Sequence, residues 1–226
     1  MVKNLKENIE GEIISITFIL LVFILAIPFY KIKPEYSRKV IHIMLGNFYF
    51  IALLYFTEWY FAFLGPFIFI FINYFSVKYK IIKLMLRHEK EKENITIKKD
   101  YGTVYYAISL TIITIYSWKI NKPNVGLCPF LSMAFGDGLA CLIGGAIKSP
   151  YKIIFGSKKS LAGSGAMFII SFALFGIYFC YYNIRFWIIK GLFMGICSMI
   201  LEAFSPFGTD NLTVPLGNLF IVSFLI

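Results

Sequence analysis

The stretch 135-FGDGLACLIGG-145 places an aspartate, Asp137, between two glycines in an apolar run that extends from about residue 125 to 147. A carboxylate at that depth in a lipid-spanning helix costs a few kcal/mol or more, and intramembrane acids are functional by default. Positions 134, 140, 141 and 144 on the same helical face are all small. Such residues either let another helix approach closely or leave room for a ligand. The stretch predicts a polar site inside a membrane helix, with a structural carboxylate satisfied by a neighbouring helix as the alternative.

Composition identifies the class of protein around this stretch. Of 226 residues, 59% are hydrophobic and only 15% are charged, whereas about a quarter of a soluble domain is charged. The net charge of +10 resides in short connections between apolar runs. This distribution indicates loops that face anionic headgroups and a phosphorylated ligand, and it argues against a nucleic-acid partner. We expect one integral membrane domain over residues 1–226.

Apolar segments of spanning length define the predicted helices. The last is the shortest and contains Pro215, so the sequence predicts an all-α, polytopic transmembrane bundle of seven or eight spans. The candidate spans lie at about 13–30, 40–56, 59–77, 101–117, 125–147, 165–182, 186–202 and 211–226. The long polar insertion at 78–100 is expected to be a solvated, partly helical loop.

The distribution of basic residues predicts the orientation in the membrane. Sixteen lysines and arginines fall in the odd-numbered connections, against five in the N-terminus and the even-numbered ones. Since cytoplasmic loops are enriched in these residues, the connections at about 31–39, 78–100, 148–164 and 203–210 are expected in the cytoplasm. The N-terminus is expected outside.

This topology predicts that the unusual polar residues meet at the cytoplasmic side. Arg38, Lys39 and His42 begin the second span, and Arg38 and His42 share one helical face. The motif 158-KKSLAGS-164 leads into the sixth span, Glu202 closes the seventh, and 208-GTDN-211 opens the last.

The predicted cluster holds the groups needed to handle polyphosphate with magnesium. Asp137 and Asp210 are hard oxygen ligands suited to Mg²⁺, and Lys158 and Lys159 neutralise phosphate charge. Backbone N–H groups at residues 163–165 can bind phosphate at the start of a helix. The segment 156-GSKKS-160 lacks the spacing of a Walker A motif.

Four motifs in order resemble the family of integral-membrane, CTP-dependent lipid kinases, which includes dolichol, phytol and farnesol kinases and the fungal CTP-dependent diacylglycerol kinase. They are 37-SRKVIHIMLG-46, 136-GDGLACLIGG-145, 158-KKSLAGSGA-166, and Glu202 followed by 210-DNLTVP-215. Dolichol kinases tend to have an acid at the position of Ala162, so the third motif looks closer to the phytol and diacylglycerol branch.

The resemblance implies the site residues position by position. Among the carboxylates at these positions we expect Asp137, Glu202 and Asp210 to be catalytic, with Asp137 and Asp210 as the metal ligands and Glu202 or Asp210 as the base. The implied nucleotide-binding residues are Arg38, Lys39, His42, Gly136, Gly144, Gly145, Lys158, Lys159, Ser160, Gly163, Ser164 and Asn211.

The resemblance also implies the reaction. Family members transfer the γ-phosphoryl group of CTP to the hydroxyl of a membrane-dissolved lipid alcohol, with Mg²⁺ or another divalent cation. Two alternatives are a CTP:lipid-phosphate cytidylyltransferase, whose longer lysine-and-aspartate signature is absent from the sequence, and an ion-coupled transporter, for which no inverted repeat is visible.

Overall fold

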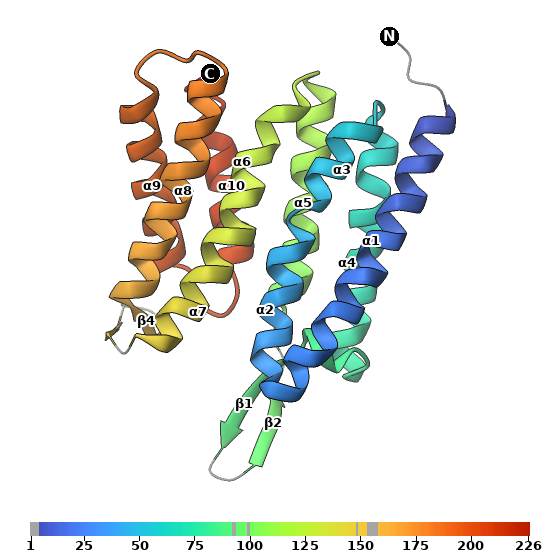
Figure 1. Cartoon of the computed structure of the whole chain (residues 1–226), viewed down its shortest axis with the longest axis vertical. Coiled ribbons are helices and arrows are strands. Elements are labelled where there is room, and N and C mark those ends of the chain that lie inside the picture. Colours follow the sequence, from blue (N-terminus) through green and yellow to red (C-terminus); the bar gives the residue numbers. More distant parts are fainter. Residues whose placement is uncertain (1–4, 92–93, 99, 148, 153–157) are drawn as a thin grey trace.

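The structure, a computed structural model, describes residues 5–91, 94–98, 100–147, 149–152 and 158–226. These residues form a bundle of helices with two short β-hairpins at one end (Figure 1). The helices are α1 (Leu5–Ile32), α2 (Pro34–Leu45), α3 (Phe48–Tyr55), α4 (Trp59–Tyr79), α5 (Gly102–Lys119), α6 (Leu127–Leu131), α7 (Gly138–Ala146), α8 (Leu161–Tyr181), α9 (Trp187–Ala203) and α10 (Asp210–Val222). The strands are β1 (Arg87–Glu91), β2 (Asn94–Lys98), β3 (Pro150–Lys152) and β4 (Lys158–Ser160).

The predicted all-α bundle is confirmed, and each predicted apolar segment coincides with helix. The second segment is interrupted at Gly46 and Asn47, between α2 and α3. Within the described residues, four helical segments are long and apolar enough to cross a membrane: Leu5–Ile32, Trp59–Tyr79, Pro123–Ala146 and Leu161–Tyr181. The remaining predicted spans are shorter, interrupted or more polar.

Successive helices run up and down the bundle. The connections that follow α1, α4, α7 and α9 lie towards one end, and α1 begins and α10 ends at the other (Figure 1). Both hairpins lie at the end with these four connections. The predicted site residues at the starts of α2, α8 and α10 are therefore brought to the same end of the molecule.

The polar insertion differs from the expectation of a partly helical loop. After a short 3₁₀ turn at Lys83–Met85, the chain forms the antiparallel pair β1–β2, in which Arg87 lies opposite Lys98. The segment 94-NITIK-98 alternates β-branched and polar residues, which favours a strand over a helix.

Large apolar side chains cover the outside of the bundle. Along α1, Ile16, Leu20 and Ile24 are 58%, 60% and 61% exposed, although such residues are usually buried in a soluble protein. An exposed apolar face of this length fits contact with lipid.

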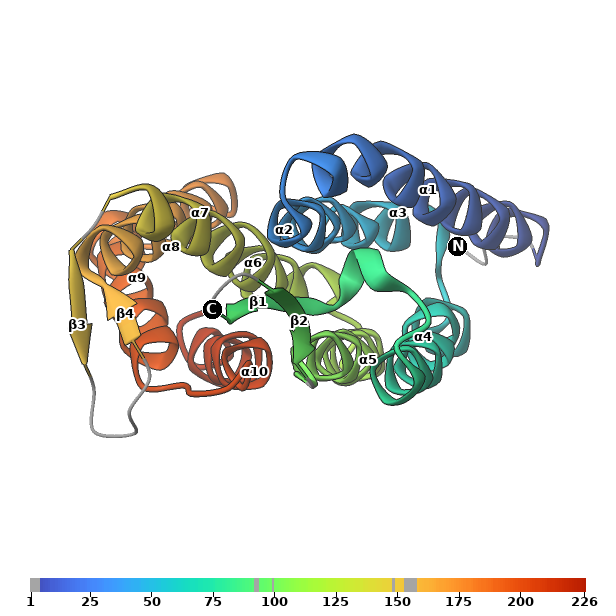
Figure 2. The same cartoon turned by 90° about the horizontal axis from the view of Figure 1, so that it is seen from below.

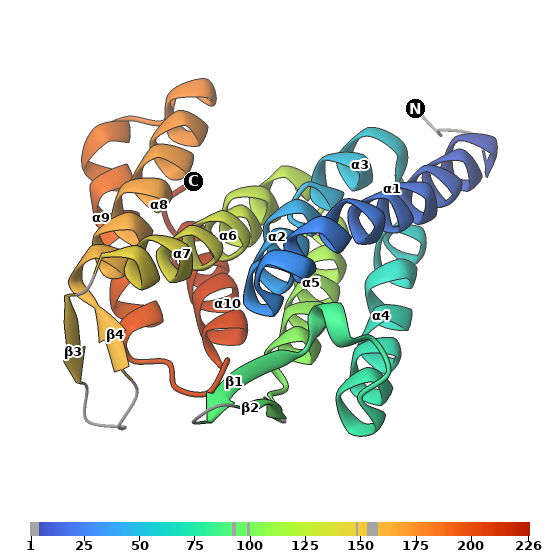
Figure 3. The same ribbon diagram turned by 60° about the horizontal axis from the view of Figure 1, so that its bottom comes forward.

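Viewed along its axis, the bundle has two groups of helices, α1–α5 and α7–α10, with α6 between them (Figure 2). Buried aromatic residues join the first group to α6: Tyr49 packs against Phe130, and its hydroxyl donates to the carbonyl of Pro123 at 2.9 Å. In the tilted view, α2 lies beside α7, and α10 lies beside α6, in the region where the groups join (Figure 3).

Candidate active site

A π-helical turn, Ser132–Asp137, places the central carboxylate. It joins α6 to α7 within one continuous helical segment and ends at Asp137. The wider turn changes which residues face inward, and such turns occur frequently at functional sites. Asp137 is thereby buried between the two groups of helices.

Lys39 and His42, one turn apart on α2, both reach Asp137. The Lys39 ammonium donates to Asp137 Oδ2 at 2.8 Å, and His42 Nε2 lies 3.4 Å from the same oxygen. The side chains of Lys39 and Asp137 are only 4% and 9% exposed. Tyr106 of α5 fixes this part of α2, because its hydroxyl donates to the His42 carbonyl at 3.1 Å.

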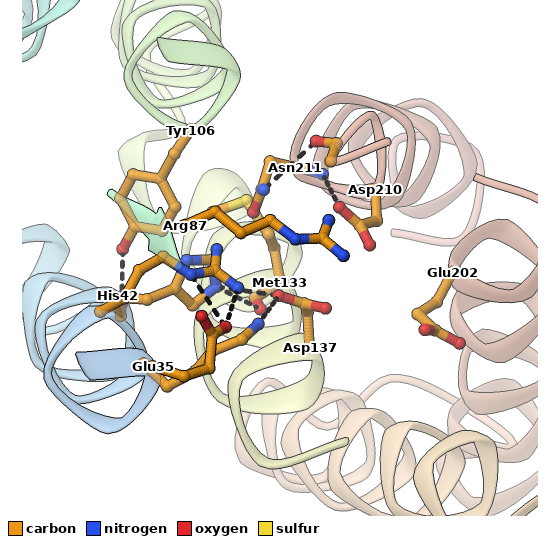
Figure 4. Close-up of polar contacts among 12 residues, drawn as sticks. Glu35, His42, Arg87, Tyr106, Met133, Asp137, Glu202, Asp210 and Asn211 are labelled. Atoms are coloured by element: carbon orange, nitrogen blue, oxygen red, sulfur yellow. Dashed lines mark hydrogen bonds and ion pairs between the residues drawn. The ribbon is translucent and has the colours of Figure 1, made fainter. Parts of the chain in front are cut away.

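A second lysine, Lys159 of β4, faces the other two predicted carboxylates. Its Nζ lies 2.5 Å from Glu202 Oε1 and 3.2 Å from Asp210 Oδ2. Glu202 ends α9 and Asp210 begins α10, so the short connection between these helices holds both acids beside the lysine. Figure 4 shows the side chains of Asp137, Glu202 and Asp210 directed towards one shared space.

The three carboxylates are suited to a divalent cation. One oxygen from each of Asp137, Glu202 and Asp210 lies within 4.8 Å of the others. Glu202 Oε2 and Asn211 Oδ1 are buried without a hydrogen-bond partner among the described residues. Buried polar atoms are normally satisfied, and hard oxygen donors of this kind are the ligands that Mg²⁺ prefers.

The charges of the cluster also favour a bound cation. Two lysines face three carboxylates, so the cluster carries an excess of negative charge. Burial and the nearby Asp137 carboxylate raise the pKa of Asp210 above its usual range, although Lys159 opposes this rise. Burial alone would lower the pKa of Lys159, but the Asp210 and Glu202 carboxylates raise it well above its usual value. A bound cation would relieve the repulsion between the acids.

The predicted serine-and-glycine motif caps and packs α8. Ser160 is the N-cap, and its hydroxyl accepts from the Gly163 N–H at 3.0 Å. This bond occupies one of the N–H groups predicted to bind phosphate. Ser164 is buried in the first turn, and the side chain of Lys158 lies outside the described part of the chain.

The glycines of the aspartate motif were expected to leave room for a nucleotide. In the structure, Gly136 and Gly144 face other side chains instead. A Cβ on Gly136 would lie 2.5 Å from Met167 Sδ, and one on Gly144 would lie 2.3 Å from Ser160 Oγ. A Cβ on Gly163 would lie 2.8 Å from the Ala140 carbonyl oxygen. These glycines let α7 and α8 pack closely, and of the predicted glycines only Gly145 faces open space.

The remaining predicted residues border the cluster. Arg38 points to Glu35, with its Nε donating to Glu35 Oε1 at 3.0 Å. The backbone N–H of Asn211 donates to Asp210 Oδ1 at 3.1 Å, and its side-chain amide donates to the Gly208 carbonyl at 3.2 Å.

Arg87 was not predicted as a site residue. It begins β1, and Figure 4 shows its guanidinium extending towards Asp210 and Asn211. Asp100 accepts from its Nη1 at 3.1 Å. In the sequence Arg87 is one of several bases in a polar insertion, and only the hairpin gives it a direction.

Fold and site define a helical membrane protein with a buried cluster of lysines and carboxylates. The chain is 37% identical to the phytol kinase of Synechocystis over 127 residues, which cover 55% of this chain and 54% of that protein. It is 31% identical to the Arabidopsis thaliana chloroplastic farnesol kinase over 151 residues, covering 61% and 45%. A probable chloroplastic phytol kinase of Triticum aestivum is 28% identical over 217 residues, covering 86% and 68%.

The chain is similar to these phytol and farnesol kinases, which agrees with the family that its motifs resemble. It spans about half the length of the Synechocystis and Arabidopsis proteins. No family model and no solved structure matches it.

Proposed function

We propose that the chain is a lipid-alcohol kinase that transfers the terminal phosphoryl group of CTP to the hydroxyl of a prenol-type lipid. The convergence of Asp137, Glu202 and Asp210 with Lys39 and Lys159 carries this proposal. The relatives named as phytol and farnesol kinases support a prenol-type acceptor. The family resemblance of the motifs supports CTP as donor.

In the proposed reaction the alcohol oxygen forms a bond to the terminal phosphorus as the bond from that phosphorus to the bridging oxygen breaks. The nucleoside diphosphate leaves, and the hydroxyl proton moves to a carboxylate. Glu202 is suited to accept it, because Oε1 faces Lys159 while Oε2 has no hydrogen-bond partner among the described residues.

The other groups act on charge and position. Asp137 and Asp210 would hold the Mg²⁺, which when bound neutralises charge on the phosphates. Lys159 supplies positive charge to the transferring group. Lys39 fixes the direction of the Asp137 carboxylate through their 2.8 Å contact.

We also propose that the site faces the cytoplasm in a multi-pass arrangement. The connections at the site end of the bundle hold most of the lysines and arginines, and cytoplasmic loops carry such an excess.

Labelled nucleotides test the function directly. Purified protein in lipid is given γ-³²P-CTP or α-³²P-CTP with a panel of prenols and a diacylglycerol, and ATP is compared as donor. The kinase transfers only the γ label to lipid. Transfer of the α label to a lipid phosphate would instead identify a cytidylyltransferase, and solute movement in liposomes without lipid labelling would identify a transporter.

Asp137→Asn is the expected inactive variant, because it keeps the size of the side chain and removes its charge. The matched control is Glu58→Gln, an exposed acid before α4 at the opposite end of the bundle. Full activity in Asp137→Asn would overturn the site assignment.

A further inference from the structure

Two adjoining cavities lead away from the carboxylate cluster. Arg38, His42, Met85 and Thr103 help to line the first. The second is lined by apolar residues that include Gly65 and Pro66. Leu45, Phe69 and Tyr106 line both cavities, so the two adjoin, and together they are called the groove.

Arg38, His42 and Thr103 form the polar end of this groove. His42 lines the first cavity, and its Nε2 lies 3.4 Å from Asp137 Oδ2. The Tyr106 ring contacts the His42 ring edge-on, with 4.7 Å between ring centroids. Tyr106 forms the wall of the groove next to His42. A ligand whose polar head sits at His42 is therefore one side chain away from the Asp137 carboxylate.

The far end of the groove is apolar. Ile19 of α1 and Phe48 of α3 form one wall, and Leu110 of α5 forms the other. Figure 2 shows α1–α3 on one side of this region and α4 and α5 on the other. Thr103 and Leu110 are seven residues apart on α5, so the groove follows that helix for about 10 Å. An apolar lining along about two turns of α5 suits a hydrocarbon chain.

We propose that this groove holds the isoprenoid tail of the alcohol substrate, with its hydroxyl at His42 and Asp137. The inference rests on the proposed kinase function and adds the place and chemistry of the acceptor site. Metal and phosphates then lie on the side of Lys159, Glu202 and Asp210, and the tail lies on the side of α2, α4 and α5. Asp137 stands where the two sides meet.

Gly65 allows the second cavity to be closed without disturbing the fold. A Cβ at this position would meet nothing closer than the Phe48 ring at 3.9 Å, an ordinary contact. Leucine is also a better helix former than glycine by up to about 1 kcal/mol. Gly65→Leu is expected to fold, to fill the apolar end of the groove and to leave the first cavity open. Gly65→Ala is the milder version of the same change.

The measurement is kcat/KM of the full chain in lipid for prenols of two, three and four isoprene units. For Gly65→Leu we expect kcat/KM for the three- and four-unit prenols to fall by at least about tenfold relative to the two-unit prenol, with a smaller fall for Gly65→Ala. Ile68→Phe, which adds bulk at a position of α4 that is 49% exposed, is the control and keeps the wild-type profile. An equal change for all chain lengths would overturn the proposal.

Photocrosslinking separates this proposal from the kinase function. A four-unit prenol with a diazirine at its tail end should label α4 or α5 of the wild type, and Gly65→Leu should lower this labelling at least about tenfold. Labelling at these helices without phosphorylation would retain the groove and reject the kinase. Phosphorylation with labelling elsewhere would retain the kinase and reject the groove.

Discussion

The two lysines of the cluster meet their carboxylates in different settings. Lys39 and Asp137 form a buried pair between packed helices, with side chains 4% and 9% exposed. Lys159 comes from a strand, is 16% exposed and faces two carboxylates. The Lys39 side is electrically balanced and fixed, whereas the Lys159 side has surplus negative charge and is more open. This contrast suggests that Lys39 fixes the direction of the Asp137 carboxylate, whereas Lys159 and its two carboxylates lie on the side open to the charged ligand.

The largest expected effect comes from breaking the balanced pair. Asp137→Asn leaves the Lys39 charge buried without its partner, so we expect the protein to lose about 3–5 kcal/mol of stability. Phosphoryl transfer should fall by about 10³-fold, because a preorganised charge at the reacting groups is lost. Thermal unfolding in detergent and the γ-label assay measure the two effects.

A second substitution separates stability from chemistry. Adding Lys39→Met to Asp137→Asn removes the unpaired charge, so the melting temperature should recover while activity stays absent. An active double variant would mean that Asp137 serves only to neutralise Lys39.

Lys159→Met tests the Lys159 side of the cluster. It should lower the activity and tighten the binding of a metal ion. Activity should fall by about 10²-fold, because positive charge near the transferring phosphate is lost. Mn²⁺ binding without nucleotide should become tighter, since Glu202 and Asp210 lose a competing cation. Electron paramagnetic resonance of free Mn²⁺ measures this affinity. The control is Lys83→Met, an exposed lysine beside the first hairpin, and weaker Mn²⁺ binding in Lys159→Met would contradict the assignment.

Arg87→Gln should give a smaller effect on the open side. The guanidinium extends towards Asp210 from a hairpin and its side chain is 40% exposed, so its loss should raise KM for the nucleotide about tenfold, equivalent to ~1.4 kcal/mol. Initial rates at varied nucleotide concentration measure this change. Arg185→Gln, at the opposite end of the bundle, is the control, and an unchanged KM in Arg87→Gln would exclude contact with the donor.

The same contrast explains what the sequence could predict. Apolar runs locate the helices because lipid demands a continuous apolar stretch. Asp137, Glu202 and Asp210 stand out because a charge beside or within such a run is costly. The other predicted residues of the cluster, Lys39 and Lys159, were found from the motifs that contain them.

The sequence could not predict which residues are brought into contact when the helices pack. The π-helical turn before Asp137 depends on packing against α2 and α8, and no local pattern announces it. Gly136 and Gly144 look the same in sequence whether they admit a ligand or a helix, and in the structure they admit side chains of α8 and its N-cap. Arg87 acquires its direction from strand pairing with residues that follow it in the insertion.

The smallest expected effect concerns a buried amide that ties the two sides together. Asn218 of α10 donates to Ser132 Oγ and Ser198 Oγ, both at 2.8 Å. Ser132 begins the π-helical turn that ends at Asp137, and Ser198 lies one turn before Glu202 on α9. One side chain therefore links the three helical segments that carry the carboxylates.

Asn218→Ala leaves both hydroxyls without this donor, so we expect a loss of about 1–3 kcal/mol in stability and only a few-fold fall in kcat. Ser223→Ala removes a hydroxyl at the C-cap of α10 that donates to the Leu219 carbonyl at 2.7 Å and accepts from the Tyr116 hydroxyl at 3.4 Å. It controls for general weakening of α10. Thermal unfolding and initial rates are compared for both variants. If Asn218→Ala abolished activity while unfolding at the wild-type temperature, Asn218 would have to act in the reaction itself, and the separation into a fixed side and an open side would fail.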